Sequence, residues 1–73
     1  MVEVGDMVRF IAADVAREPR WVRGDIAVVD YAKRLNDELL KRMRVKVLRT
    51  GHTLLMDEQA FTYRILEKLD DQD

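Results

Sequence analysis

The amino-acid sequence predicts a small, mostly β domain with five strands and one short inserted helix. Three observations carry this prediction. Side chains alternate between apolar and basic over residues 43–47, the pattern of a strand with one buried face. Thr50-Gly51 follows, and a glycine can take the positive φ that a tight turn between strands requires. The segment 24–31 begins with a glycine and is rich in β-favouring residues, namely Ile26, Val28, Val29 and Tyr31.

The segment 2–11, VEVGDMVRFI, fits both a strand and a helix. In steps of two, one face collects Val2, Val4, Val8 and Phe10. A strand is favoured because Gly5-Asp6 is poor in a helix interior and because the later strands need a pairing partner. We expect this first strand at about residues 7–12 and a long loop over 13–23.

A helix is predicted over 33–42, between the second strand and the third. Leu35 and Leu39 lie about one helical turn apart. Two acid–base pairs, Asp37–Lys41 and Glu38–Arg42, have the acid on the N-terminal side. This is the favourable orientation, and each pair stabilises a helix by about 0.3 kcal/mol.

The third and fourth strands, at 43–49 and 52–56, form a hairpin around the turn glycine. A single helical turn at 57–60 then leads into a fifth strand at 61–66, where β-branched and aromatic residues predominate. The expected core consists of Val8, Phe10, Ile26, Val28, Val45, Val47, Leu54, Met56, Phe61, Tyr63 and Ile65.

A three-helix bundle is the alternative fold. Its helices would use three apolar stripes at helical spacing, Val4-Met7-Ile11-Val15, Tyr31-Leu35-Leu39 and Phe61-Ile65-Leu69. The two folds differ most at 4–15 and 57–69, which the first makes extended and the second helical.

The order of the predicted elements resembles that of Src-homology-3-like small barrels. Two motifs are similar to the KOW-type members of that class. Gly5-Asp6-Met7-Val8 matches their opening Gly-Asp-x-Val strand, and 24–29 matches their Gly-x-x-Gly-x-Val second strand, with Ala27 in place of the second glycine. The resemblance covers residues 4–31 and implies a five-stranded barrel. It also implies a binding role, because related barrels serve in ribosomal proteins, transcription factors and protein adaptors.

The chain has 73 residues, enough for one small domain, which we expect over 1–69 with a frayed acidic tail at 70–73. It has no cysteine and one histidine, so neither a disulfide nor a zinc site is expected. No catalytic triad or phosphate-binding loop is present, and we expect no enzyme activity, catalytic residue, metal or cofactor. The apolar runs are too short to cross a bilayer, and the acidic N-terminus lacks a signal-peptide pattern. We therefore expect a cytoplasmic protein without membrane contact.

The charges are segregated along the chain, although the net charge is only −1. Residues 31–52 carry +5, whereas 1–30 carry −2 and 53–73 carry −4. Such separation favours an oriented contact with a protein partner, because nucleic-acid binding is more typical of a domain that is basic overall. The alternatives are an RNA- or DNA-binding small barrel and a structural subunit of a homo-oligomer or larger complex.

Two segments supply the candidate partner-binding residues. In the 13–24 loop, Trp21 is flanked by Arg17, Arg20 and Arg23, and tryptophan and arginine are enriched at interaction hot spots. In the basic 41–49 segment the candidates are Arg42, Arg44, Lys46 and Arg49. The leading hypothesis is a non-enzymatic adaptor or regulator that docks through both segments. The competing interpretation is that Trp21 closes one end of the barrel and the basic side chains are simply solvated.

Overall fold

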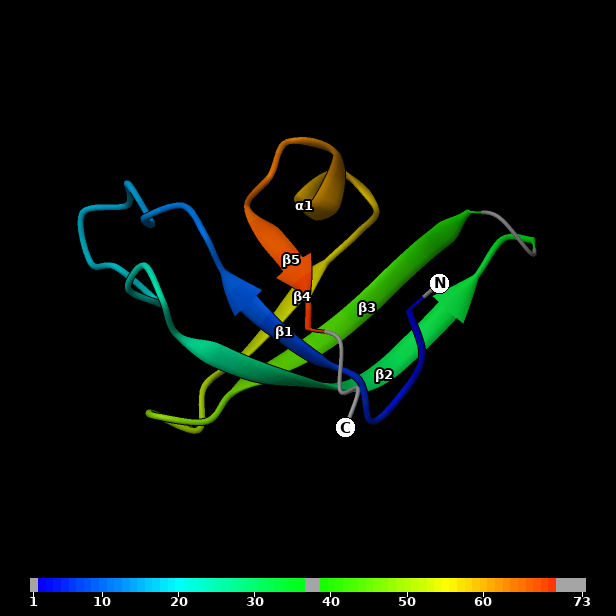
Figure 1. Cartoon of the computed structure of the whole chain (residues 1–73), viewed down its shortest axis with the longest axis horizontal. Coiled ribbons are helices and arrows are strands. Elements are labelled where there is room, and N and C mark those ends of the chain that lie inside the picture. The colour runs from blue at the N-terminus through cyan, green and yellow to red at the C-terminus, as the bar shows by residue number, and fades with distance from the viewer. Residues whose placement is uncertain (1, 37–38, 70–73) are drawn as a thin grey trace.

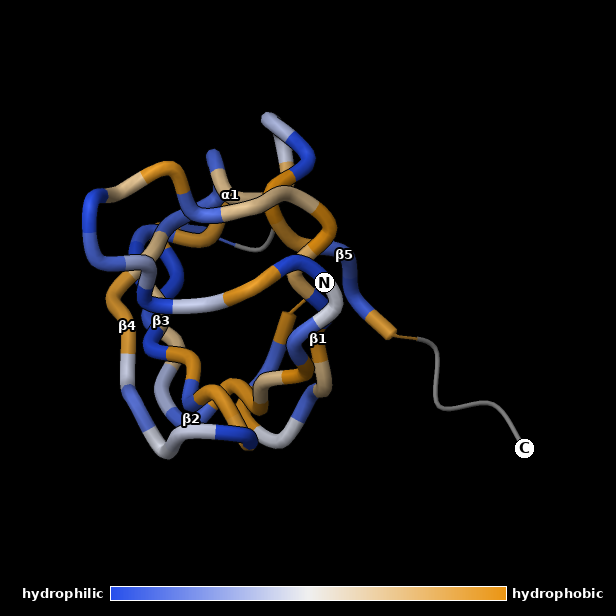
Figure 2. Tube along the Cα trace, turned by 90° about the vertical axis from the view of Figure 1, so that its left-hand side faces the viewer, coloured by the Kyte–Doolittle hydropathy of each residue, from blue (hydrophilic) through white to orange (hydrophobic). Residues whose placement is uncertain are grey.

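The computed structural model describes residues 2–36 and 39–69. They form five antiparallel strands in one open sheet and one short helix: β1 (Met7–Phe10), β2 (Ile26–Arg34), β3 (Leu40–Val47), β4 (Thr53–Met56), α1 (Gln59–Thr62) and β5 (Leu66–Lys68). The strand order is β4-β3-β2-β1-β5 (Figure 1). Figure 2 shows the sheet curled around its interior, with α1 across one end. The mostly β prediction is confirmed, and the three-helix alternative is wrong.

The first strand falls inside the predicted range of 7–12. A tight turn precedes it, in which Gly5 has a φ of 98° and Asp6 N–H donates to the Glu3 carbonyl at 3.0 Å. The glycine is favoured there because other residues pay for a positive φ. A long loop then leads from β1 to β2, as the sequence predicted.

The predicted helix at 33–42 is wrong, because β2 continues to Arg34 and β3 begins at Leu40. Leu35 N–H donates to the Leu39 carbonyl at 2.9 Å and closes a β-hairpin. The expected ion pairs involve residues 37 and 38, which lie outside the described residues. Local pairs contribute only about 0.3 kcal/mol each, whereas burying an aliphatic side chain such as Leu40 contributes about 1.5–3 kcal/mol. Tertiary packing therefore overrides the helical pattern.

The inward face of β2 is one residue out of phase with the prediction. Ala27 and Val29 are fully buried, whereas Ile26 and Val28, the predicted core residues, are only partly buried. Apolar side chains occupy both phases of this strand, so periodicity alone could not choose between its faces. Ala27 lies opposite Val8 of β1, where the small side chain lets the two buried strands pack together.

Two irregularities occur in the pairing of β2 with β3. The register passes from Val29↔Val45 to Tyr31↔Arg44, so Asp30 is an extra residue on β2. A second shift falls near the hairpin end, where Arg34 pairs with Leu40. Such bulges change which side chains face the core, because alternation restarts after each extra residue.

The predicted hairpin of the third and fourth strands is confirmed. Met43 pairs with Met56 and Val45 with Leu54, and Gly51 in the turn has a φ of 78°. Met43, Val45 and Leu54 are buried, while Met56 packs against the core from a partly exposed position.

The predicted strand at 61–66 is wrong. α1 occupies Gln59–Thr62, Arg64 reverses the chain with a φ of 59°, and β5 begins only at Leu66. The Asp57 carboxylate accepts a hydrogen bond from Gln59 N–H at 2.9 Å, which favours a helical start. Tyr63 was expected in the core but is 69% exposed. Phe61 and Ile65 are partly buried and pack against the core.

The single tryptophan belongs to the core. Trp21 is 5% exposed, and its ring stacks on Phe10 with a centroid distance of 4.4 Å and an interplanar angle of 19°. Its Nε1–H donates to the Ala12 carbonyl at 2.8 Å. The ring thus fastens the long loop onto β1. The complete buried apolar set is Val8, Phe10, Trp21, Ala27, Val29, Leu40, Met43, Val45, Val47, Leu54, Ala60 and Leu66.

Replacing Trp21 by alanine should destabilise the whole domain. The change removes a buried aromatic ring, which costs about 3–5 kcal/mol, comparable to the total stability of so small a domain. Urea unfolding followed by circular dichroism measures the loss. Trp21→Phe keeps an aromatic ring for the stack on Phe10 and loses only the Nε1–H donor and some volume, so its loss should be smaller. A Trp21→Ala chain as stable as the parent would contradict the packing described.

Candidate binding surface

Asp14 holds the long loop together through hydrogen bonds with Ala16 and Arg20. Its carboxylate accepts hydrogen bonds from the Arg20 backbone N–H at 2.8 Å, from Arg20 Nε at 2.9 Å and from Ala16 N–H at 3.1 Å. The Arg20 guanidinium also lies over the Trp21 ring, 4.9 Å from its centroid. Arg20 is therefore engaged within the chain, through an ion pair and a cation–π contact.

The hydrogen bonds from the Arg20 side chain and backbone lower the pKa of Asp14 to about 2. They stabilise the charged carboxylate, which outweighs the opposing effect of its partial burial.

A second ion pair joins the long loop to the turn between β3 and β4. Arg49 donates from Nε and Nη2 to the two oxygens of Asp25, both at 2.8 Å. Asp25 is buried and also accepts from Val22 N–H at 2.9 Å. The Arg49 side chain holds the pKa of Asp25 below its usual value. Arg49 is thus a structural link between two predicted binding segments.

The remaining candidates of the basic segment share one surface. Arg42, Arg44 and Lys46 point away from the core of β3, and cross-strand pairing sets them beside residues of β2 and β4. We call this surface the outer face. Its members are Tyr31, Lys33, Lys41, Arg42, Arg44, Lys46, Leu48, Thr53 and Leu55, all of which are exposed.

Most cations of the outer face lack an internal partner. Arg44 donates to the Asp30 carboxylate at 2.8 Å. Among the residues that the structure describes, Lys33, Lys41, Arg42 and Lys46 form no ion pair with a carboxylate. Within the part of the chain that the structure describes, no carboxylate therefore neutralises these four cations through an ion pair.

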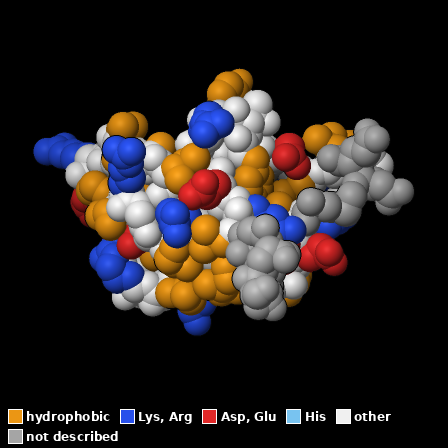
Figure 3. All heavy atoms as spheres, viewed as in Figure 1, with side chains coloured by type: hydrophobic (Ala, Val, Ile, Leu, Met, Phe, Trp, Pro, Cys, Tyr) orange, Lys and Arg blue, Asp and Glu red, His pale blue; other side chains and the backbone are white. Residues whose placement is uncertain are grey.

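Apolar side chains lie among these cations. Leu55 is 66% exposed and Tyr31 is 42% exposed, and both are cross-strand neighbours of Arg44. A mixture of exposed apolar and basic side chains is typical of a protein-binding surface, in which aromatic residues and arginine are enriched. Figure 3 shows the other side of the molecule, where β1 and β5 lie in front of β3 and β4.

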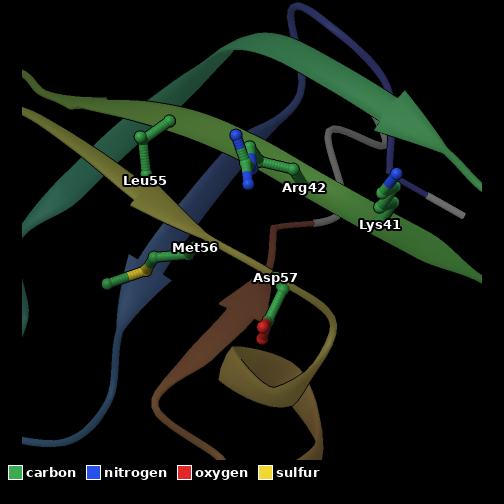
Figure 4. A pocket seen from close by; sticks show the side chains of 5 residues that line it. All are labelled: Lys41, Arg42, Leu55, Met56 and Asp57. Atoms are coloured by element: carbon green, nitrogen blue, oxygen red, sulfur yellow. The ribbon is translucent and has the colours of Figure 1, made fainter.

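A hollow of about 290 Å³ lies where β4 ends, lined by Lys41, Arg42, Leu55, Met56 and Asp57 (Figure 4). In Figure 4 the Asp57 carboxylate is directed toward α1, away from the Arg42 side chain. The two cations therefore border the hollow on the outer side, and apolar side chains form much of its remaining wall.

The structure separates the predicted site residues into three groups. Trp21, Arg20 and Arg49 hold the loop and the hairpin turn in place. Arg17 and Arg23 are exposed in the loop, without an ion pair among the described residues. The other three candidates lie on the outer face.

Six members of the outer face are not among the predicted site residues: Tyr31, Lys33, Lys41, Leu48, Thr53 and Leu55. Tyr31 was read only as a strand residue and Leu55 only as part of a hairpin. Lys33 and Lys41 fall in the predicted helix at 33–42, although Lys41 also belongs to the predicted basic 41–49 segment. Alternation could not have placed Lys41, because it breaks at the register shift, where Lys41 and Arg42 are both exposed.

No group of His, Cys, Asp or Glu side chains suited to a metal ion occurs within 2–36 and 39–69. Over the same residues, no helix has the length and apolar character needed to span a membrane. Comparison with protein-family models, with curated proteins and with solved structures finds no match. The function must therefore be inferred from the chain's own geometry.

The stability of the domain should fall as the pH is lowered from about 4 to about 2. The pKa of Asp14 in the folded chain is about 2, below the ordinary value of 3.8, so the unfolded chain takes up this proton first. The stabilisation is complete above pH 4 and is lost as the pH falls through 2. Urea unfolding at a series of pH values measures this dependence.

Asp14→Asn should make the acid limb of that profile shallower. Glu18→Gln is the matched control, because Glu18 is exposed in the same loop and has no ion pair among the described residues. An unchanged limb in Asp14→Asn would contradict the assignment.

Proposed function

We propose that this chain is a non-enzymatic binding module, an adaptor or regulator, that docks on a protein partner through the outer face. One observation carries the proposal: a single sheet surface combines exposed apolar side chains with cations that form no ion pair among residues 2–36 and 39–69. At one end of this surface, the Asp25–Arg49 pair joins the long loop to the turn between β3 and β4.

The electrostatics favour a protein over a nucleic acid. The outer face is positive, but the chain as a whole carries −1. Nucleic-acid binding draws on long-range attraction to many phosphates, which a net negative chain weakens. An acidic protein surface needs only local complementarity, which steers and orients the encounter.

We also propose that the sheet is that of a Src-homology-3-like barrel. The strand order, the long β1–β2 connection, the tight β3–β4 turn and the single helical turn before β5 support it. Related barrels include protein adaptors, which agrees with the proposed role, although a fold alone does not assign a function.

A nucleic acid is the second candidate partner. Tyr31 lies beside Arg44 and could stack on a base while neighbouring cations contact phosphate. That mode predicts an affinity that falls steeply with salt, in proportion to the number of phosphates contacted.

Site-specific photo-crosslinking in cells of the native host tests the proposal. A benzophenone amino acid replaces Tyr31 on the outer face or, as the matched control, Tyr63, which is exposed near α1. We expect a protease-sensitive, nuclease-resistant adduct from position 31 and none from position 63. Combining the position-31 probe with Arg42→Glu and Lys46→Glu should lower the yield at least about tenfold, because two favourable charge contacts become repulsive.

Three results would argue against the proposal. A nuclease-sensitive adduct would assign the outer face to nucleic acid. Equal adducts from both tyrosine positions would show no selectivity for the outer face. No adduct at position 31 would remove the proposed protein partner.

A further inference from the structure

β4 is an edge strand whose outward backbone groups are open. Val47 N–H donates to the His52 carbonyl, and Leu48 N–H donates to the Ile26 carbonyl. Alternation along the ladders then directs the backbone groups of residues 54 and 56 toward β3 and those of Thr53 and Leu55 away from it. Among the described residues, nothing else pairs with these two outward residues.

The sequence of β4 lacks the devices that usually protect a sheet edge. Thr53–Met56 contains no charged residue, proline, glycine or bulge. The opposite edge strand, β5, differs because it carries charged residues. Glu67 forms an ion pair with Arg9 of β1, and Lys68 forms one with Asp6. Exposed, uncharged edge strands readily pair with another chain.

We propose, on the basis of the proposed function, that the partner contributes an extended segment that adds to β4 as a further strand, with acidic side chains toward the outer face. Main-chain hydrogen bonds to Thr53 and Leu55 would supply the pairing. Alternate side chains of the added strand would then decide its specificity.

Charge complementarity selects acidic side chains for the outer positions. Lys46 of β3 is the cross-strand partner of Thr53 in β4. Because the threonine side chain is small, the Lys46 ammonium can reach past it to an added strand. Beyond Leu55, where the chain turns toward α1, Lys41 and Arg42 border a hollow that Asp57 also lines. The Asp57 carboxylate accepts from Gln59 N–H at 2.9 Å and is directed toward α1, which leaves the two cations to meet an incoming carboxylate. Arginine suits this role because its guanidinium can bind a carboxylate in a bidentate manner.

The opposite face of the added strand meets an apolar surface. An adjoining hollow of about 260 Å³ is lined by Leu55, Met56, Asp57, Gln59, Ala60 and Ile65. Residues that alternate with the acidic ones would point toward it, since side chains in a strand have a period of two. The complementary segment is therefore an alternation of acidic and apolar residues.

Neither a second copy of the chain nor a nucleic acid fits both the open edge of β4 and the cations of the outer face. A second copy of the chain would bring its own unpaired cations onto the same outer face, where like charges repel. A nucleic acid would supply phosphates but lacks amide donors and acceptors at strand spacing. An acidic extended peptide supplies both kinds of contact.

The test uses a short blocked peptide of alternating Glu and Val, titrated into the full chain labelled with ¹⁵N. At about 1 mM peptide, the range expected of so small an interface, the amide signals of Thr53 and Leu55 should shift most. Replacing every Glu by Gln should weaken binding about tenfold. N-methylation of the amides that face β4 should abolish it.

Two protein variants separate the contributions. Leu55→Pro removes an N–H that does not belong to the β3–β4 ladder, so the fold should persist while binding falls at least about tenfold. Arg42→Gln should weaken binding about fivefold. Arg17→Gln, which removes an exposed cation from the long loop, is the matched control and should leave binding unchanged. Circular dichroism checks that each variant is folded.

Any of five results would overturn the inference, and four of them come from the peptide titrations and from sedimentation. These are no shift at β4, equal binding of the N-methylated peptide, equal binding by folded Leu55→Pro, and a chain dimer in sedimentation that Leu55→Pro dissociates. A single-stranded oligonucleotide that binds β4 more tightly than the peptide would also overturn it. If position 31 still crosslinks a protein while the peptide fails, the proposed function stands and only the strand-addition mode is lost.

Discussion

The pairing of β2 with β3, with its two register shifts, is the constraint on which the sheet and the outer face depend. With unbroken alternation after Val29, Tyr31 would point into the core and Ala32 away from it. The extra residue at Asp30 reverses this, and Tyr31 pairs with Arg44 on the outer face. On β3 the second shift keeps Lys41 exposed and buries Leu40. One irregular hairpin thus fills the interior and gathers cations on the outside.

The chain uses its basic residues in two distinct ways. Arg20 and Arg49 each donate several hydrogen bonds to an aspartate and hold loops against the sheet. Such charge-assisted contacts are geometrically specific, and in each pair the arginine and the aspartate neutralise one another. Arg42 and Lys46 instead lie on the outer face of β3 and have no such partner among the described residues. The surface available for recognition is therefore the basic hairpin rather than the arginine-rich loop.

The sequence was most informative where one periodicity had no competitor. Residues 43–47 alternate cleanly, and Gly51 marks the turn, so the hairpin with β4 could be predicted. Residues 33–42 carry a helical pattern, but local ion pairs are weak compared with the burial of Leu40, and such long-range packing is invisible in one sequence. The C-terminal segment failed for a related reason. Its strand-favouring residues lie beside a carboxylate that supports a helical turn, and Ala60 is buried there.

The candidate site could be predicted only in part, because charge alone does not show which arginines are engaged. Alternation over 43–47 puts Arg44 and Lys46 on one side of the predicted strand, whereas Arg42 falls in the predicted helix at 33–42. Nothing in the sequence indicated that Arg49 would meet Asp25, 24 residues away along the chain. The same long-range closure placed Trp21 on Phe10 and removed its ring from the surface.

The position of that ring determines what the protein's own fluorescence can report. Trp21 is the single tryptophan of the chain, and it is enclosed between Phe10 and the Arg20 guanidinium. Its emission will report whether the long loop is packed against β1, since separation of the loop from β1 would expose the indole to water. A ligand that settles on the distant strand edge will leave this signal almost unchanged, so optical assays of recognition need a dye placed elsewhere.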